Sequence, residues 1–101
     1  MRFRVSKAAE RELDRIFVYW AQRAGVDVAD KLIDSIEERF AALGNHPSAG
    51  RKCDEFAPGV YCFPAGKYLI YYRRQRGLIH ILHVVHGARD QARAFAPEPP
   101  R

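Results

Sequence analysis

Three histidines stand at intervals of three residues in the second half of the chain, as His80, His83 and His86. Together with Cys53 and Cys62 they suggest a zinc site, because imidazole and thiolate are ligands that zinc prefers. The residues around the histidines are branched and apolar, however, and predict a strand. In a regular strand His83 opposes His80 and His86, and the latter two share a face about 20 Å apart. We therefore expect no metal site and no cofactor.

Histidine is also the side chain that can move a proton near neutral pH. Cleavage of RNA would need such a group beside phosphate-binding arginines, and His83 or His86 next to Arg73 or Arg89 offers this combination. The alternative interpretation is that these are strand histidines, half-buried against aromatic neighbours. Four tyrosines of the same region also allow two interpretations: they could stack on nucleic-acid bases, or they could pack in the core and across strands. These are Tyr61, Tyr68, Tyr71 and Tyr72.

The two cysteines bear on the compartment. The first four residues lead straight into a charged helical pattern, not into the apolar segment of a secretory signal. We therefore expect a cytoplasmic protein with two free thiols, Cys53 and Cys62. A disulfide would require the two side chains to face each other, which their spacing does not decide. No apolar run approaches the roughly 18 residues that a membrane-spanning helix needs, so we expect no membrane association.

Composition predicts a single globular domain with a basic surface. The chain has 101 residues, of which 48% are hydrophobic and 29% charged. We expect the domain to span residues 1–96 and the Pro-rich tail 97–101 to be disordered. The net charge of +5 is distributed unevenly along the chain. Residues 1–46 carry eight basic and eight acidic side chains, whereas residues 47–101 carry nine basic and four acidic side chains. The second half therefore predicts contact with phosphates or an acidic partner, unless the domain is merely basic.

The first half of the chain predicts a short strand and two helices, which must position the histidines and basic residues of the second half. Residues 3–5 alternate as a short strand, and Ser6 predicts an N-cap. Gly25 ends the first helix, Asp27 can cap a second, and residues 44–45 supply a left-handed stop. A link this short predicts an antiparallel helical hairpin. The apolar stripes are Leu13, Ile16, Phe17, Trp20 and Ala24 in the first helix, and Ala29, Leu32, Ile33, Ile36, Phe40 and Leu43 in the second.

The second half predicts strands. Residues 48–52 form a loop, and strands follow at 60–63, 67–74 and 78–85, the first two joined by a turn at 64–66. The order is β-α-α-β-β-β. We therefore expect an α+β fold in which the helical hairpin packs on a small antiparallel sheet.

Four sequence patterns occur in this same order. They are Ala9-x-x-x-Leu13-x-x-Ile16-x-x-Tyr19-Trp20, Leu43-x-x-x-Pro47-x-x-Gly50-Arg51, Lys67-Tyr68-x-Ile70-x-Tyr72-Arg73 and Ile79-x-Ile81-x-x-Val84-x-His86-x-x-Arg89-Asp90. Across residues 3–93 the chain thereby resembles the RelE/ParE family of toxins. The run Val84-Val85-His86-Gly87-Ala88-Arg89-Asp90 is most similar to the ParE subfamily.

The resemblance implies the toxin of a bacterial type II toxin–antitoxin module. Such a toxin is neutralised by a cognate antitoxin, here expected to be ParD-like with an acidic binding segment, and meets operator DNA only through that antitoxin. ParE-type toxins inhibit DNA gyrase without catalysis. RelE-type toxins are ribosome-dependent mRNA endoribonucleases that use a Lys and Arg cluster with a Tyr or His near the C-terminus. An inert member that only binds its antitoxin is the third alternative.

The two active alternatives assign different sets of residues, which share Arg73. Inhibition of gyrase would use a set of arginines, Arg73, Arg74, Arg76, Arg89 and Arg93. A nuclease would use the basic residues and histidines Arg51, Lys52, Arg73, His83 and His86. Because no Tyr or His follows His86, the resemblance favours the gyrase inhibitor.

The antitoxin is expected to contact the first half of the chain. Successive helix residues are rotated by about 100°, which places Tyr19 off the centre of the first apolar stripe. Tyr19 is therefore predicted to be partly exposed. We assign Tyr19 and Phe3 as candidate antitoxin contacts.

Overall fold

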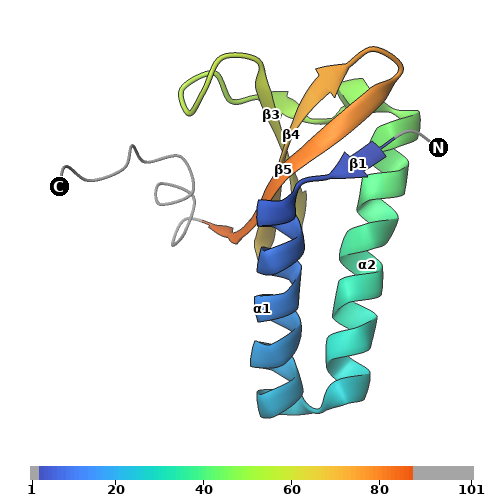
Figure 1. The fold of residues 1–101 in the computed structure, drawn as a ribbon, viewed down its shortest axis with the longest axis vertical. Coiled ribbons are helices and arrows are strands. Elements are labelled where there is room, and N and C mark those ends of the chain that lie inside the picture. The colour runs from blue at the N-terminus through green and yellow to red at the C-terminus, as the bar shows by residue number, and fades with distance from the viewer. Residues whose placement is uncertain (1–2, 88–101) are drawn as a thin grey trace, which may run out of the picture.

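The computed structural model describes residues 3–87, which form two helices and a five-stranded sheet (Figure 1). The elements in chain order are β1 (Phe3–Val5), α1 (Lys7–Ala24), α2 (Val26–Asn45), the short 3-10 helix η1 (Pro47–Ala49), β2 (Arg51–Lys52), β3 (Val60–Ala65), β4 (Tyr68–Gln75) and β5 (Leu78–His86). The expected domain end at residue 96 and the expected disordered tail 97–101 lie outside the described residues.

The helical hairpin begins as predicted and turns more tightly than predicted. The Ser6 hydroxyl accepts the Ala9 N–H at 3.0 Å and donates to the Leu82 carbonyl at 2.8 Å, so the cap also fixes α1 to β5. The predicted cap at Asp27 is wrong: Gly25, at φ 98°, both ends α1 and precedes α2 directly. Neither helix is long and apolar enough to cross a bilayer, and residues 3–87 hold no other candidate.

The sheet order is β1-β5-β4-β3-β2. The predicted α+β fold is confirmed, with two differences in the sheet. β1 pairs parallel with β5, which makes the sheet mixed, while the other pairs are antiparallel. Arg51 and Lys52, predicted to lie in a loop, form the edge strand β2 opposite Cys62 and Tyr61.

A tyrosine joins the end of the hairpin to the sheet. The predicted stop at residues 44–45 is wrong, since α2 runs through Asn45 without a left-handed residue. Pro47 then starts η1, and its carbonyl accepts the Tyr72 hydroxyl at 2.8 Å. The same hydroxyl accepts the Gly50 N–H at 3.0 Å. A Cβ at Gly50 would collide with this hydroxyl and with the Cys62 carbonyl, so only glycine fits there.

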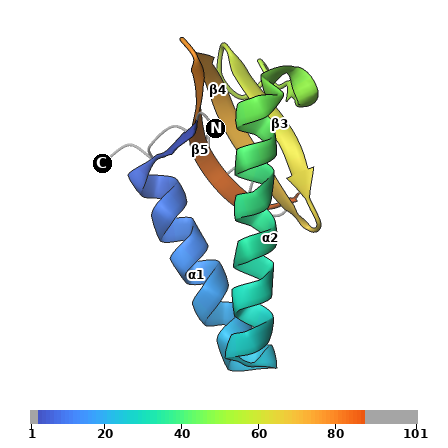
Figure 2. The same ribbon diagram turned by 90° about the vertical axis from the view of Figure 1, so that its right-hand side faces the viewer.

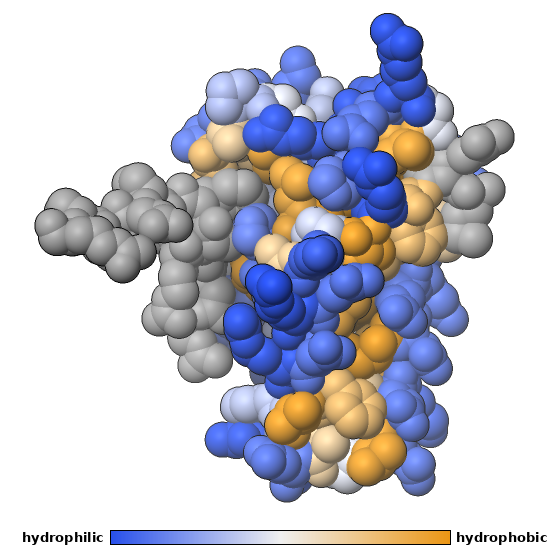
Figure 3. Space-filling view, in the orientation of Figure 1, coloured by the Kyte–Doolittle hydropathy of each residue, from blue (hydrophilic) through white to orange (hydrophobic). Residues whose placement is uncertain are grey.

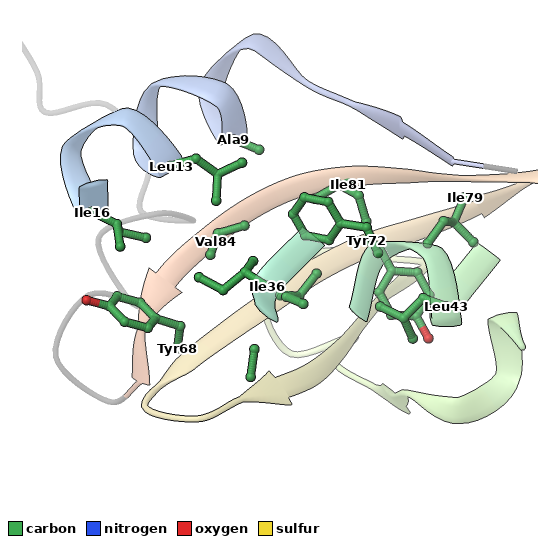
Figure 4. Close-up of a cluster of buried hydrophobic side chains, with 13 residues drawn as sticks. Ala9, Leu13, Ile16, Ile36, Leu43, Tyr68, Tyr72, Ile79, Ile81 and Val84 are labelled. Atoms are coloured by element: carbon green, nitrogen blue, oxygen red, sulfur yellow. The ribbon is translucent and has the colours of Figure 1, made fainter. Parts of the chain in front are cut away.

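The sheet has a hydrophobic cluster on each face. The helix-side face packs under α1 and α2, and Figure 4 shows Leu13 and Ile36 pointing toward Val84 of β5. On part of the opposite face, here called the distal face, the loop between β2 and β3 packs on the sheet, where Phe56 meets Tyr71 edge-to-face at 5.6 Å. The distal cluster consists of Cys53, Val60, Cys62, Tyr71 and Val85.

A bulge interrupts the pairing of β4 with β5. Tyr71 is in register with His83 and Tyr72 with Ile81, so Leu82 is an extra residue in β5. An extra residue shifts the alternation of side chains, because strand residues alternate faces with a period of two. Side chains on either side of Leu82 therefore do not follow the alternation of a regular strand.

The tip of the helical hairpin extends beyond the strands (Figures 1 and 2). Ile16 is the last buried residue of α1, a helix that the structure describes throughout. Figure 3 shows hydrophobic side chains gathered at the lower end of the hairpin. In the last two turns of α1, Val18 is 51% and Tyr19 41% exposed. The predicted partial exposure of Tyr19 is confirmed.

Candidate target-binding face

The histidines of β5 do not gather at one place. His80 is in register with Arg73, which in turn pairs with Val60 of the distal cluster, so His80 lies on the distal face. His86 is in register with Tyr68 of the helix-side cluster, and the two rings meet edge-to-face at 5.7 Å. The prediction that His80 and His86 share a face is therefore wrong, because the bulge reverses the alternation between them. The prediction that His83 opposes His80 is wrong for the same reason, since His83 is in register with Tyr71 of the distal cluster.

His83 is held by a helix residue. Its Nδ1 lies 3.0 Å from Oε2 of Glu12, while Oε1 of Glu12 accepts the Val84 N–H at 2.9 Å. β1 ends at Val5, so α1 supplies an acceptor to the edge of β5 that β1 no longer covers. Glu12 was not singled out from the sequence, and no local pattern could have done so, because its partners are more than 70 residues away.

Two arginines and a histidine between them form a basic row across the distal face. Arg4 of β1, His80 of β5 and Arg73 of β4 are in register on three neighbouring strands. Since neighbouring strands lie about 4.8 Å apart, the two arginines flank the imidazole within a row about 10 Å long. Burial lowers the pKa of His80, and the charges of Arg4 and Arg73 lower it further. Among residues 3–87 no carboxylate forms an ion pair with any of the three.

This basic row can bind an anion. Like charges held side by side repel one another, and a phosphate or carboxylate placed between them would relieve that repulsion. Sequence reasoning found Arg73 but missed Arg4, since Arg4 belongs to the half of the chain without net charge. Only the parallel pairing of β1 with β5 brings it into the row.

The other predicted basic residues divide between the two faces. Arg51 is in register with Cys62 of the distal cluster, and its guanidinium lies 3.6 Å from the Glu55 carboxylate. Arg74 lies over the ring of Tyr61, which packs against the helix-side cluster. Lys52 is in register with Tyr61 and so points to that face as well. Arg76 is exposed in the turn between β4 and β5, and two further predicted residues, Arg89 and Arg93, lie outside the described residues.

The residues of the nuclease alternative are spread over the sheet. Arg51 and Arg73 belong to the distal face, as does His83 by its register with Tyr71, whereas Lys52 and His86 belong to the helix-side face. His83 is bound to Glu12, and His86 packs on Tyr68. Within residues 3–87 no three side chains of His, Cys, Asp and Glu come close enough to hold a metal ion.

The two candidate antitoxin contacts lie in different surroundings. Tyr19 stands at the exposed tip, with the Arg23 guanidinium 3.8 Å from its ring centre. The hollow beside it is lined also by Asp14, Arg15, Val18 and Gln22. Phe3 is half-buried against Phe40, with ring centres 5.7 Å apart. The hollow beside Phe3 is acidic, being lined also by Asp34, Glu37, Glu38 and Ala41.

Comparison with known proteins identifies the family. A family model described as "ParE toxin of type II toxin-antitoxin system, parDE" matches residues 3–91. The chain belongs to the ParE toxin family. The resemblance found in the sequence is therefore confirmed, and this ParE-family chain is the toxin of a type II toxin–antitoxin module.

Individual relatives agree with this assignment. The ParE-family chain is 31% identical to Toxin ParE1 of Mycobacterium tuberculosis (strain ATCC 25618 / H37Rv), over 88% of its own length and 92% of the relative. It is 30% identical to Toxin ParE3 of Caulobacter vibrioides (strain ATCC 19089 / CIP 103742 / CB 15), over 80% of its own length and 81% of the relative. A solved structure described as "Chromosomal ParDE TA system from P. aeruginosa" shares its fold, with a TM-score of 0.75 and 23% identity over 86% of this chain and 96% of the other.

Proposed function

We propose that this ParE-family chain arrests bacterial growth by binding DNA gyrase through its distal face, and that a cognate antitoxin neutralises it. The observation that carries the proposal is the row of Arg4, His80 and Arg73, which has no acidic partner among the described residues. Gyrase at work holds DNA, so the two arginines of this basic row suit the phosphates of that complex. Action on gyrase also requires the chain to stay in the bacterial cytoplasm.

Inhibition by binding fits the histidines better than catalysis does. RNA cleavage would need an acid–base group beside phosphate-binding arginines. His83 is engaged by Glu12, and His86 packs on Tyr68, away from Arg73. His80 does lie beside arginines, and its lowered pKa keeps the imidazole neutral at physiological pH. A neutral ring is able to accept a proton, so the RelE-like nuclease remains an outcome that experiment must separate.

The antitoxin is proposed to bind the exposed tip of the hairpin. An acidic segment would be attracted by Arg15 and Arg23 beside Tyr19, which outnumber the one carboxylate of that hollow, Asp14. It would be repelled by the three carboxylates beside Phe3. Of the two residues assigned from the sequence, Tyr19 therefore has the more complementary surroundings. Val18 adds exposed apolar surface at the same place. We accordingly centre the proposed antitoxin contact on Tyr19.

Pulse-labelling after induction separates the proposed targets. DNA and protein synthesis are followed in parallel during the first minutes after the chain is expressed without antitoxin. The proposal predicts that DNA synthesis falls first. If protein synthesis falls first, the nuclease alternative is favoured. If neither falls and growth continues, the chain is an inert member that only binds its antitoxin.

A further inference from the structure

The two cysteines face each other under the distal loop. Cys53 follows β2 and Cys62 lies in β3, and both residues are buried. Their sulfur atoms are 2.7 Å apart, with the Cys53 thiol donating to the Cys62 sulfur. The backbone holds this arrangement, because the Cys53 N–H donates to the Val60 carbonyl at 2.7 Å and extends the pairing of β2 with β3.

We propose that Cys53 and Cys62 form a redox pair, which a peroxide converts into an intramolecular disulfide that joins the edge strand β2 to β3. A disulfide requires the sulfur atoms to approach to about 2.05 Å with the two side chains directed at each other. The thiols already meet this directional requirement, so bond formation needs a shift of the side chains and no rearrangement of the strands. The pair lies outside the basic row, and the inference is independent of the proposed gyrase target.

The reaction takes two steps. The Cys62 thiolate attacks one oxygen of hydrogen peroxide, which forms a sulfenic acid and releases the second oxygen as hydroxide. The Cys53 sulfur then attacks the sulfenic sulfur, forms the S–S bond and expels the hydroxyl group. The two cysteine protons end on the two hydroxide ions, so two thiols and one peroxide give one disulfide and two waters.

The surroundings assign the order of attack. Burial raises the pKa of Cys53 to about 12, and the hydrogen bond to Cys62 adds to this, whereas the charge of Arg51 opposes it. Because the Cys53 thiol also donates its hydrogen bond to the Cys62 sulfur, Cys53 suits the resolving role and Cys62 the attacking role. A resolving sulfur at 2.7 Å would intercept the sulfenic acid before a second peroxide could oxidise it further.

The disulfide would stabilise the fold around the distal cluster. It closes the loop that carries Phe56 onto Tyr71 and fastens the short strand β2, which pairs with β3 alone among the described strands. A cross-link over a loop of this length restricts the unfolded chain. We expect oxidation to raise the Tm by roughly 5–15 °C.

The test treats the full-length chain with hydrogen peroxide, blocks remaining thiols under denaturing conditions and digests with Glu-C protease. Cleavage after Glu55 separates the two cysteines, so an intramolecular disulfide appears as two linked peptides. The methionine at position 1 lies on another peptide and does not confuse the assignment. We expect linked peptides from monomeric protein, a raised Tm, and reversal of both by dithiothreitol.

A variant tests the order of the steps. In Cys53→Ala the sulfenic acid at Cys62 lacks its resolving partner, so dimedone should trap it and prolonged peroxide should yield the sulfinic acid. Wild-type protein should show neither product. The proposal is overturned if both wild-type thiols stay unmodified, if Cys62 is over-oxidised, or if the disulfide joins two chains. The wild-type result stands by itself should the variant not fold.

Discussion

Glu12 of α1 binds His83 of β5 at 3.0 Å and, with its other carboxylate oxygen, caps the edge of the same strand at Val84. Beyond the end of β1, the Glu12 carboxylate supplies the hydrogen-bond acceptor that a neighbouring strand would otherwise offer to β5. It fixes the long strand that carries His80 in the basic row and His86 near its end. A helix residue thereby supports the geometry of the proposed target-binding face without belonging to it.

Loss of this contact should destabilise the fold. In Glu12→Ala the Val84 N–H loses its acceptor, and an unsatisfied backbone donor costs about 1–3 kcal/mol when partly buried. Asp14→Ala is the matched control, because Asp14 is exposed on the same helix. Urea unfolding of both variants measures the difference. Equal stabilities of the two would show that Glu12 contributes nothing to the edge of β5.

The Tyr72 hydroxyl should matter for stability in the same way. Tyr72→Phe removes the donor to Pro47 and the acceptor for Gly50, and we expect a loss of about 1–3 kcal/mol. Tyr61→Phe is the control, since Tyr61 stacks on Tyr72 and its hydroxyl makes no hydrogen bond to another described residue. Calorimetry of both variants tests this, and a Tm unchanged in Tyr72→Phe would contradict the assigned bonds.

The basic row should make stability sensitive to acid. The pKa of His80 is lowered in the folded chain, so below the unfolded pKa of about 6.5 the unfolded state binds the proton more readily. The free energy of unfolding should therefore fall as the pH drops from 7.5 to 5.5. Arg73→Gln should lessen this fall, and Arg74→Gln, on the other face, should not. Identical pH profiles for the two variants would argue against coupling within the row.

Tyr19 should contribute to antitoxin affinity and not to folding. Truncating an exposed aromatic anchor at an interface costs about 1–3 kcal/mol, so Tyr19→Ala should raise the Kd of the antitoxin complex roughly tenfold or more. Lys31→Ala, an exposed residue of α2, serves as control. Titration calorimetry with the purified antitoxin gives both values. An unchanged Kd for Tyr19→Ala would move the proposed contact away from the tip.

Local patterns predicted the elements well, because helix and strand periodicity depends on near neighbours. Leu13 and Ile16 of α1 are buried as expected, as are Ile36, Phe40 and Leu43 of α2. The prediction was wrong at the C-terminal end of the α1 stripe. Trp20 is half-buried and Ala24 exposed, since the hairpin tip extends beyond the strands that would cover it.

Relationships between distant segments were not accessible from the sequence. The partner of β1, the bulge at Leu82 and the pairing of Glu12 with His83 all depend on strand register, which no local spacing encodes. The first two of these features decide which basic residues and histidines share a face. The sequence could thus predict the types of residue in the candidate site. The structure was needed to show which residues belong to it: Arg4 does, and Lys52 lies on the other face.

The central claim is that the distal face inhibits gyrase, and a supercoiling assay with purified gyrase, relaxed plasmid and the purified chain tests it directly. Arg73→Gln and Arg74→Gln change neighbouring residues of β4 that face opposite sides of the sheet. We predict that wild-type protein blocks supercoiling and that Arg73→Gln requires about tenfold more protein, equivalent to about 1.4 kcal/mol. Arg74→Gln should remain close to wild type. Undiminished supercoiling with the wild-type chain, or equal loss in both variants, would contradict the claim.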